Sequence, residues 1–133
     1  GNKLYTLEYL YDYREIDLYC DGKLIAEGVS MYAGGYEICD DRVVYLTDWD
    51  STKEMGTLRI YDGKETQTIA EDVHSFVCTR DGIAYLSEYS TRRCEGDLYY
   101  FNGRKSVSVA QDVTQLYHVY DNGGSYDASM LGW

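Results

Sequence analysis

The sequence YLTDW (residues 45–49) recurs 40 residues later as YLSEY (residues 85–89) and is matched 40 residues earlier by YTLEY (residues 5–9). All three copies follow one pattern: a tyrosine, two variable residues, an acid and an aromatic. Leucines at positions 18, 58 and 98 keep the same spacing. A period of about 40 residues that recurs three times predicts a fold built from repeated units.

Each of these leucines opens a short stretch that ends in a turn sequence. The turn sequences are Asp21-Gly22, Asp62-Gly63 and Asn102-Gly103. Such dipeptides tolerate the positive φ that a two-residue hairpin turn requires. The most uniform part of the unit follows, as IAEGV (residues 25–29), IAEDV (residues 69–73) and VAQDV (residues 109–113). We therefore expect a hairpin after each leucine, with the first copy shorter by a few residues.

The second copy divides most clearly into strands. Its turn residues separate four segments of strand length, at residues 57–61, 65–70, 75–79 and 83–89. The connections between these segments are short, and short connections make neighbouring strands antiparallel. The unit is therefore predicted to be a four-stranded up-and-down meander. No segment shows a helical period beyond about two turns.

An antiparallel four-stranded unit of this length is typical of a β-propeller blade. GTLRIYDGK (residues 56–64) with IAEDV, and GDLYYFNGR (residues 96–104) with VAQDV, resemble the repeats of bacterial extracytoplasmic β-propeller proteins of the TolB-like type. The resemblance covers roughly residues 16–120. It implies an all-β, propeller-like fold and an extracytoplasmic or cell-surface location, but it assigns no functional residues. A twisted β-sandwich or barrel is the alternative fold.

The chain is expected to form a single repeat domain over residues 1–133. A strand at 3–10 is followed by units at 16–50, 57–90 and 97–130. This makes about three blades, whereas closed propellers typically have four to eight. An incomplete ring exposes apolar faces and strand edges. Three arrangements would cover them: covalently linked blades upstream in a longer chain, a homodimer that closes a six-bladed ring, or stacking as a sandwich or barrel.

Charge excludes several classes of partner. The chain has 12 Lys and Arg residues against 23 Asp and Glu residues, a net charge of −11 at pH 7. An acidic chain repels the phosphate backbone, so we expect no nucleic-acid partner. The longest apolar runs, such as residues 43–46, are far shorter than the roughly 20 residues that span a bilayer, so no membrane insertion of this segment is expected. Gly1 in place of an initiator Met is compatible with a signal peptide, lipid anchor or membrane helix that has been removed upstream.

The four cysteines, Cys20, Cys39, Cys78 and Cys94, are not spaced as a zinc site, because no pair is separated by two residues. Half-buried unpaired thiols are the preferred interpretation, and one or two disulfides are the alternative. We expect no metal site and no cofactor.

Acidic residues recur at the ends of the predicted strands. Glu8, Asp48 and Glu88 keep the period, so we expect them to serve the fold, for example by accepting hydrogen bonds from backbone N–H groups. The loop that follows Asp48 lacks the glycine and the terminal glutamate of a calcium-binding EF-hand. His74 and His118 are not equivalent in the repeat, and no serine in a G-x-S-x-G turn accompanies them. We therefore expect no catalytic residue.

Some of the acidic and aromatic side chains are expected to form a ligand-binding platform that stacks on a sugar or grips a peptide. The candidates are Asp48, Trp49, Asp50, Glu88, Tyr89 and Tyr126. The leading hypothesis is a non-catalytic, propeller-like binding or interaction module whose partner is a protein or a glycan. A carbohydrate-active hydrolase or lyase domain is one alternative. An extracytoplasmic sensor domain of a membrane-anchored protein is another.

Overall fold

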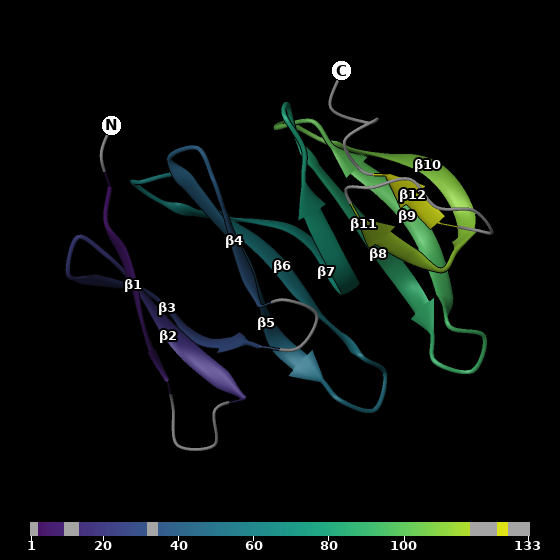
Figure 1. The fold of residues 1–133 in the computed structure, drawn as a ribbon, viewed down its shortest axis with the longest axis horizontal. Helices are drawn as coiled ribbons and strands as arrows, with labels where there is room; N and C mark the ends of the chain where they lie inside the picture. Colours follow the sequence, from purple (N-terminus) through teal and green to yellow (C-terminus); the bar gives the residue numbers. More distant parts are fainter. Residues whose placement is uncertain (1–2, 10–13, 32–34, 118–124, 128–133) are drawn as a thin grey trace.

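The structure is a computed structural model that describes residues 3–9, 14–31, 35–117 and 125–127, the last three and residue 117 by their backbone alone. Every regular element in these residues is a β-strand (Figure 1), which confirms the all-β class. The strands are β1 (Tyr5–Tyr9), β2 (Glu15–Cys20), β3 (Lys23–Ser30), β4 (Tyr36–Cys39), β5 (Arg42–Asp50), β6 (Met55–Tyr61), β7 (Thr66–Cys78), β8 (Ile83–Ser90), β9 (Glu95–Phe101), β10 (Ser106–Val113), β11 (Gln115–Tyr117) and β12 (Ser125–Asp127). Among the described residues there is no helix with the length and apolar character needed to span a bilayer.

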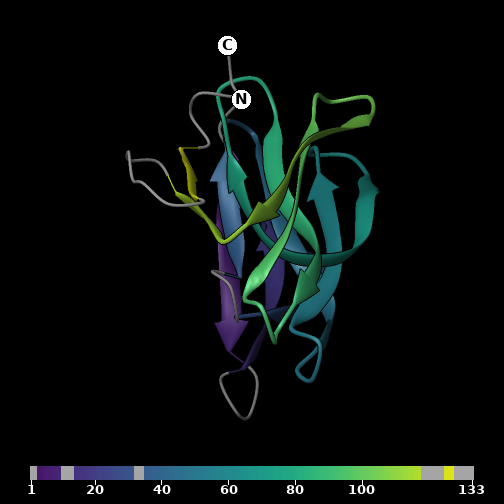
Figure 2. The same cartoon turned by 90° about the vertical axis from the view of Figure 1, so that its right-hand side faces the viewer.

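The strands form three sheets. β1, β2 and β3 make a three-stranded sheet, β4 to β10 make a seven-stranded sheet in chain order, and β11 pairs with β12. Neighbours in the first two sheets are antiparallel, as the short connections predict. β11 and β12 are parallel. The seven-stranded sheet is strongly curled (Figures 1 and 2). This curvature fits the alternative prediction of a barrel.

β7 is one strand where the sequence predicts two. Its first half pairs with β6 and its second half pairs with β8, and Val73 lies opposite both Gly56 and Ser87. The change of partner follows Asp72, which has a φ of 57°. An aspartate can adopt this left-handed conformation, so the chain bends there without ending the strand. The expected break between residues 70 and 75 was therefore wrong.

The first copy of the tyrosine pattern is shifted by one residue. Tyr45 and Tyr85 are buried, whereas Tyr5 is only half-buried and its hydroxyl donates to the carbonyl of Asp41 at 2.8 Å. The register follows leucine pairs across the strands, namely Leu7–Leu18, Leu46–Leu58 and Leu86–Leu98. A shift of one residue turns a side chain to the other face of a strand. The equivalence of Tyr5 with Tyr45 and Tyr85 was therefore wrong.

The three predicted hairpin turns are of two kinds. Asp21 and Gly22 form the expected two-residue turn, with φ values of 50° and 82°. The other two hairpins have four-residue loops, 62–65 and 102–105, in which only the glycine has a positive φ. The Oδ1 atom of Asp62 accepts hydrogen bonds from the backbone N–H groups of Lys64 and Glu65. Oδ1 of Asn102 accepts the equivalent two bonds in its own loop. A side-chain oxygen thus organises each of the longer loops.

Asp62 and Asn102 make a matched pair for a test of acid stability. The N–H groups of Glu65 and Lys64 lower the pKa of Asp62 below its ordinary value of 3.8. A group with a lowered folded-state pKa contributes stability above its unfolded pKa and loses it as pH falls through the folded value. We therefore expect Asp62→Asn to keep the loop, as Asn102 does, and to weaken the loss of stability below about pH 4. Urea midpoints at pH 3 and pH 7 measure this, and an unchanged difference between the two would contradict it.

Two of the four cysteines are bonded to each other. Cys39 in β4 and Cys78 in β7 form a disulfide, with their Cα atoms 6.4 Å apart. Cys20 is buried and free, and Cys94 is exposed and free. The preferred expectation of unpaired thiols was therefore wrong for Cys39 and Cys78.

A shared core joins the two larger sheets. Val43, Tyr45 and Tyr61 of the seven-stranded sheet pack against buried residues of the three-stranded sheet, which include Ile16 and Val29. β3 lies alongside β5. This contact brings the end of β3 next to the end of β5, where the candidate site lies.

Candidate functional site

Trp49 and Tyr89 lie at corresponding places near the ends of β5 and β8, and both are half-buried. A β-bulge precedes each ring, at Asp48 with a φ of 56° and at Glu88 with a φ of 54°. Bulges of this kind re-aim the side chains beside them. Gly56 lies opposite the first bulge, where a Cβ atom would be 2.7 Å from the carbonyl oxygen of Thr47 and 3.3 Å from the indole of Trp49. The glycine therefore lets β6 pass directly beneath Trp49.

His74 lies between these two rings. Its imidazole stacks on Tyr89 with a centroid distance of 3.5 Å and an interplanar angle of 3°, and its centroid is 6.3 Å from that of Trp49. Nδ1 of His74 is 2.8 Å from the carbonyl oxygen of Glu54. Because a carbonyl oxygen only accepts, Nδ1 carries the proton in this bond. We call Trp49, His74 and Tyr89 the aromatic row; three different strands supply it.

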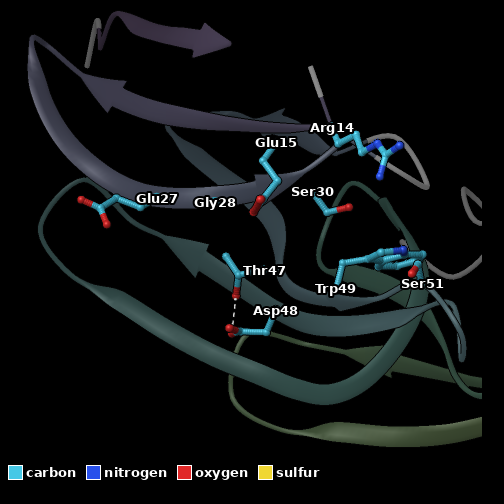
Figure 3. A pocket seen from close by; sticks show the side chains of 9 residues that line it. All are labelled: Arg14, Glu15, Glu27, Gly28, Ser30, Thr47, Asp48, Trp49 and Ser51. Carbon is cyan, nitrogen blue, oxygen red and sulfur yellow. Dashed lines mark hydrogen bonds between the residues drawn. The ribbon is translucent and has the colours of Figure 1, made fainter. Parts of the chain in front are cut away.

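Two cavities adjoin at Trp49. The first has a volume of about 390 Å³ and lies between the ends of β3 and β5 (Figure 3). The second has a volume of about 550 Å³ and lies between β5, β7 and β11. Trp49 and Ser51 line both cavities, so one ligand can contact both through the indole ring.

The first cavity is acidic. The carboxylates of Glu15, Glu27 and Asp48 line it together with the guanidinium of Arg14, and Asp48 is also paired with Arg59 at 3.4 Å. Figure 3 shows Glu27 at one end and Trp49 at the other. Oδ2 of Asp48 accepts from the Thr47 hydroxyl at 3.0 Å, and the bond is drawn in Figure 3. The excess of carboxylates disfavours an anionic ligand here.

The second cavity combines apolar and hydrogen-bonding groups. Trp49 and Leu116 supply apolar surface, and Ser75 and Gln115 supply a hydroxyl and an amide. His74 lines the same cavity. Burial raises the pKa of its stacking partner Tyr89, and the neighbouring Cys94 thiol raises it further, so this phenol stays neutral.

The structure places the predicted site residues at different cavities. Asp48 and Trp49 line the first cavity, and Tyr89 reaches the second only through its stack on His74. Glu88 lines a separate hollow of about 510 Å³ beside Tyr89 and Arg92.

Asp50 has a local role in its hairpin. Its Oδ1 atom accepts hydrogen bonds from the N–H groups of Thr52 and Lys53, at 2.9 and 3.1 Å. Both bonds lower the pKa of Asp50, and the bond from Lys53 has the larger effect. The carboxylate therefore organises the turn between β5 and β6.

Tyr126 lies in β12, and its side chain is outside the described residues, so its place in the site stays a prediction. His118 is outside them as well.

The three periodic acids do not act alike. Asp48 and Glu88 hold their bulges through the backbone, whereas Glu8 pairs opposite Asp17 in a regular part of β1. Among the hydrogen bonds of the described residues, those to backbone N–H at the end of β5 go to Asp50 and not to Asp48. Asp48 and Glu88 therefore serve the fold through their backbone conformation.

Sequence reasoning missed the part played by His74. The signal was its place directly after the uniform IAEDV segment, where its counterpart 40 residues later is Thr114. A side chain that departs from the period is free to serve a local purpose, and here it completes a row of rings beside two cavities.

Comparisons with protein-family models, curated proteins and solved structures return no match to this chain.

Proposed function

We propose that this protein is a non-catalytic binding module for a protein or a glycan, and that the aromatic row with its two cavities is the binding site. The observation that carries the proposal is the position of Trp49, which lines both cavities. Aromatic rings with a few polar groups around a concave surface are typical of ligand sites. The half-buried Trp49 and the stacked His74 are held in place by their own contacts, so little ordering is required when a ligand binds.

The module is further proposed to be propeller-like. Residues 40 apart share unusual backbone conformations, which supports a repeated unit. The matching φ values are 56° and 54° at Asp48 and Glu88, 57° and 56° at Glu54 and Cys94, 103° and 99° at Gly63 and Gly103, and 57° and 58° at Asp72 and Asp112. The disulfide between Cys39 and Cys78 supports the proposed extracytoplasmic location, because disulfides persist in oxidising compartments.

Trp49→Ala tests the site. We expect this variant to lose binding by roughly tenfold or more, the effect typical of a central aromatic anchor. The measurement is the shift of backbone amide NMR signals on addition of two probe sets, neutral oligosaccharides and short peptides of varied charge. Shifts are expected around both cavities, at residues 14–15, 27–30, 47–54, 74–75 and 114–116.

Leu24→Ala is the matched control, because Leu24 is an exposed residue of β3 that is 41% accessible and lines neither cavity. It should bind as the unaltered chain does. The proposed function fails if the shifts gather elsewhere or if Trp49→Ala binds equally well. Shortened oligosaccharides in the mass spectrum after incubation would instead identify an enzyme.

A further inference from the structure

We propose that the ligand of this site is an uncharged linear oligosaccharide, with one sugar ring on Trp49 and its neighbours in the two cavities. This inference rests on the proposed function and adds the chemical class of the ligand. The starting observation is that two cavities of about 390 and 550 Å³ share one indole ring and one hydroxyl, those of Trp49 and Ser51. A ligand that uses both cavities must therefore be extended and must cross an aromatic surface.

The lining of the second cavity matches the two kinds of surface that a sugar ring presents. A pyranose has a face of C–H groups and a rim of hydroxyls. The electron-rich face of an aromatic ring attracts the slightly positive C–H groups, and Trp49 supplies that ring. Ser75 and Gln115 offer a hydroxyl and a planar amide, which both donate and accept hydrogen bonds.

His74 adds an acceptor of fixed identity. Nδ1 donates to the carbonyl of Glu54, so in the neutral ring Nε2 is left with a lone pair. No described residue forms a hydrogen bond with Nε2. The stack on Tyr89 holds the imidazole in place. A sugar hydroxyl in this cavity can therefore donate to Nε2 without any rearrangement of the ring.

Charge selects among the possible oligosaccharides. Glu15, Glu27 and Asp48 line the first cavity; Arg14 on its wall and Arg59, which pairs with Asp48 at 3.4 Å, leave the carboxylates in excess by one, and the whole chain carries a net charge of −11. A uronic acid or a sulfated sugar would bring further negative charge to this surface, which is unfavourable. The site therefore favours neutral sugars and rejects anionic ones.

Isothermal titration calorimetry with four probes tests the inference. Cellotriose and triacetylchitotriose are the neutral trisaccharides, trigalacturonic acid is the anionic one, and glucose is the single ring. At least one neutral trisaccharide is expected to bind, about tenfold or more tightly than glucose, because it fills both cavities through linked contacts. Trigalacturonic acid is expected to give no binding heat at low salt.

Two variants assign the binding to the site. Trp49→Ala should weaken binding by roughly tenfold or more. His74→Phe keeps a ring to stack on Tyr89 but removes Nε2, and it should weaken binding about tenfold, as expected for loss of a hydrogen bond in a site built to form it. Leu24→Ala should bind like the unaltered chain. Circular dichroism spectra of the three variants show whether each is folded.

Three results would overturn the inference. The first is no heat from either neutral trisaccharide under conditions that detect a dissociation constant of about 1 mM. The second is equal binding of trigalacturonic acid. The third is binding that Trp49→Ala leaves unchanged. A peptide that binds at residues 49–54 and 74–75 while no sugar binds would defeat the oligosaccharide and leave the binding module intact. Failure of both sugars and peptides at these residues would defeat the proposed function itself.

Discussion

The double variant Cys39→Ala/Cys78→Ala is expected to unfold with a free energy about 4 kcal/mol lower than that of the unaltered chain. The disulfide joins residues 39 positions apart, so it restricts a large loop of the unfolded chain. Loop-closure entropy for a loop of this size gives the stated magnitude. Urea denaturation at pH 7, followed by circular dichroism, measures the change.

Cys94→Ala is the matched control for this prediction. Cys94 is exposed and not disulfide-bonded, and the same chemical change removes its thiol contacts with the Thr91 carbonyl and Tyr89, so it should alter the free energy of unfolding by no more than about 1 kcal/mol. The unaltered chain in the presence of a dithiol reductant should shift its midpoint as the double variant does. Equal midpoints for the double variant and the unaltered chain would show that Cys39 and Cys78 are not bonded in solution.

Leu58→Ala is expected to lower the free energy of unfolding by about 2–5 kcal/mol. Leu58 is fully buried in β6, opposite Leu46 of β5 and Ala70 of β7. Removing three carbon atoms there leaves a cavity that the paired strands on both sides cannot fill. Chemical denaturation measures the loss of stability.

Leu98→Ala repeats this test at the equivalent buried position of the next repeat. Leu98 is equally buried and lies opposite Leu86 and Ala110, the positions 40 residues after those that flank Leu58. Both variants should lose a similar amount, whereas Leu24→Ala should lose little because Leu24 is exposed. A loss for Leu58→Ala no larger than that for Leu24→Ala would contradict the position of Leu58 in the core.

Strands with local signals could be predicted from the sequence. The segments expected at 57–61 and 83–89 correspond to β6 (Met55–Tyr61) and β8 (Ile83–Ser90). Both are bounded by turn residues and rich in apolar and aromatic side chains, and such signals need no knowledge of the rest of the fold. The antiparallel arrangement followed from the short connections alone.

Features set by contacts between strands could not be predicted. Asp72 bends β7 where a turn was expected, because an aspartate with a positive φ looks the same in sequence as one that ends a strand. Tyr5 keeps the period of Tyr45 but not its register, because Leu7 pairs with Leu18 and determines which face is buried. Sequence spacing is a one-dimensional measure, and register is decided by packing in three dimensions.

The candidate site shows the same division. Trp49 and Tyr89 stood out in the sequence because each ends a conspicuous segment. The stack of His74 on Tyr89 joins residues 15 positions apart, and it depends on the pairing of β7 with β8 and on the bulge at Glu88. The cysteine pairing was equally hidden, because it requires β4 to lie within reach of the far half of β7.

The disulfide has a consequence for the integrity of the binding surface. Residues 39–78 form a covalent ring that contains both Trp49 and His74, while Gln115 and Leu116 lie outside it. Within such a ring the two aromatic side chains stay at a high effective concentration for each other even when the strands around them separate. One wall of the larger cavity therefore lies within a covalent ring, whereas Gln115 and Leu116 of the opposite wall are connected to that ring through the backbone alone.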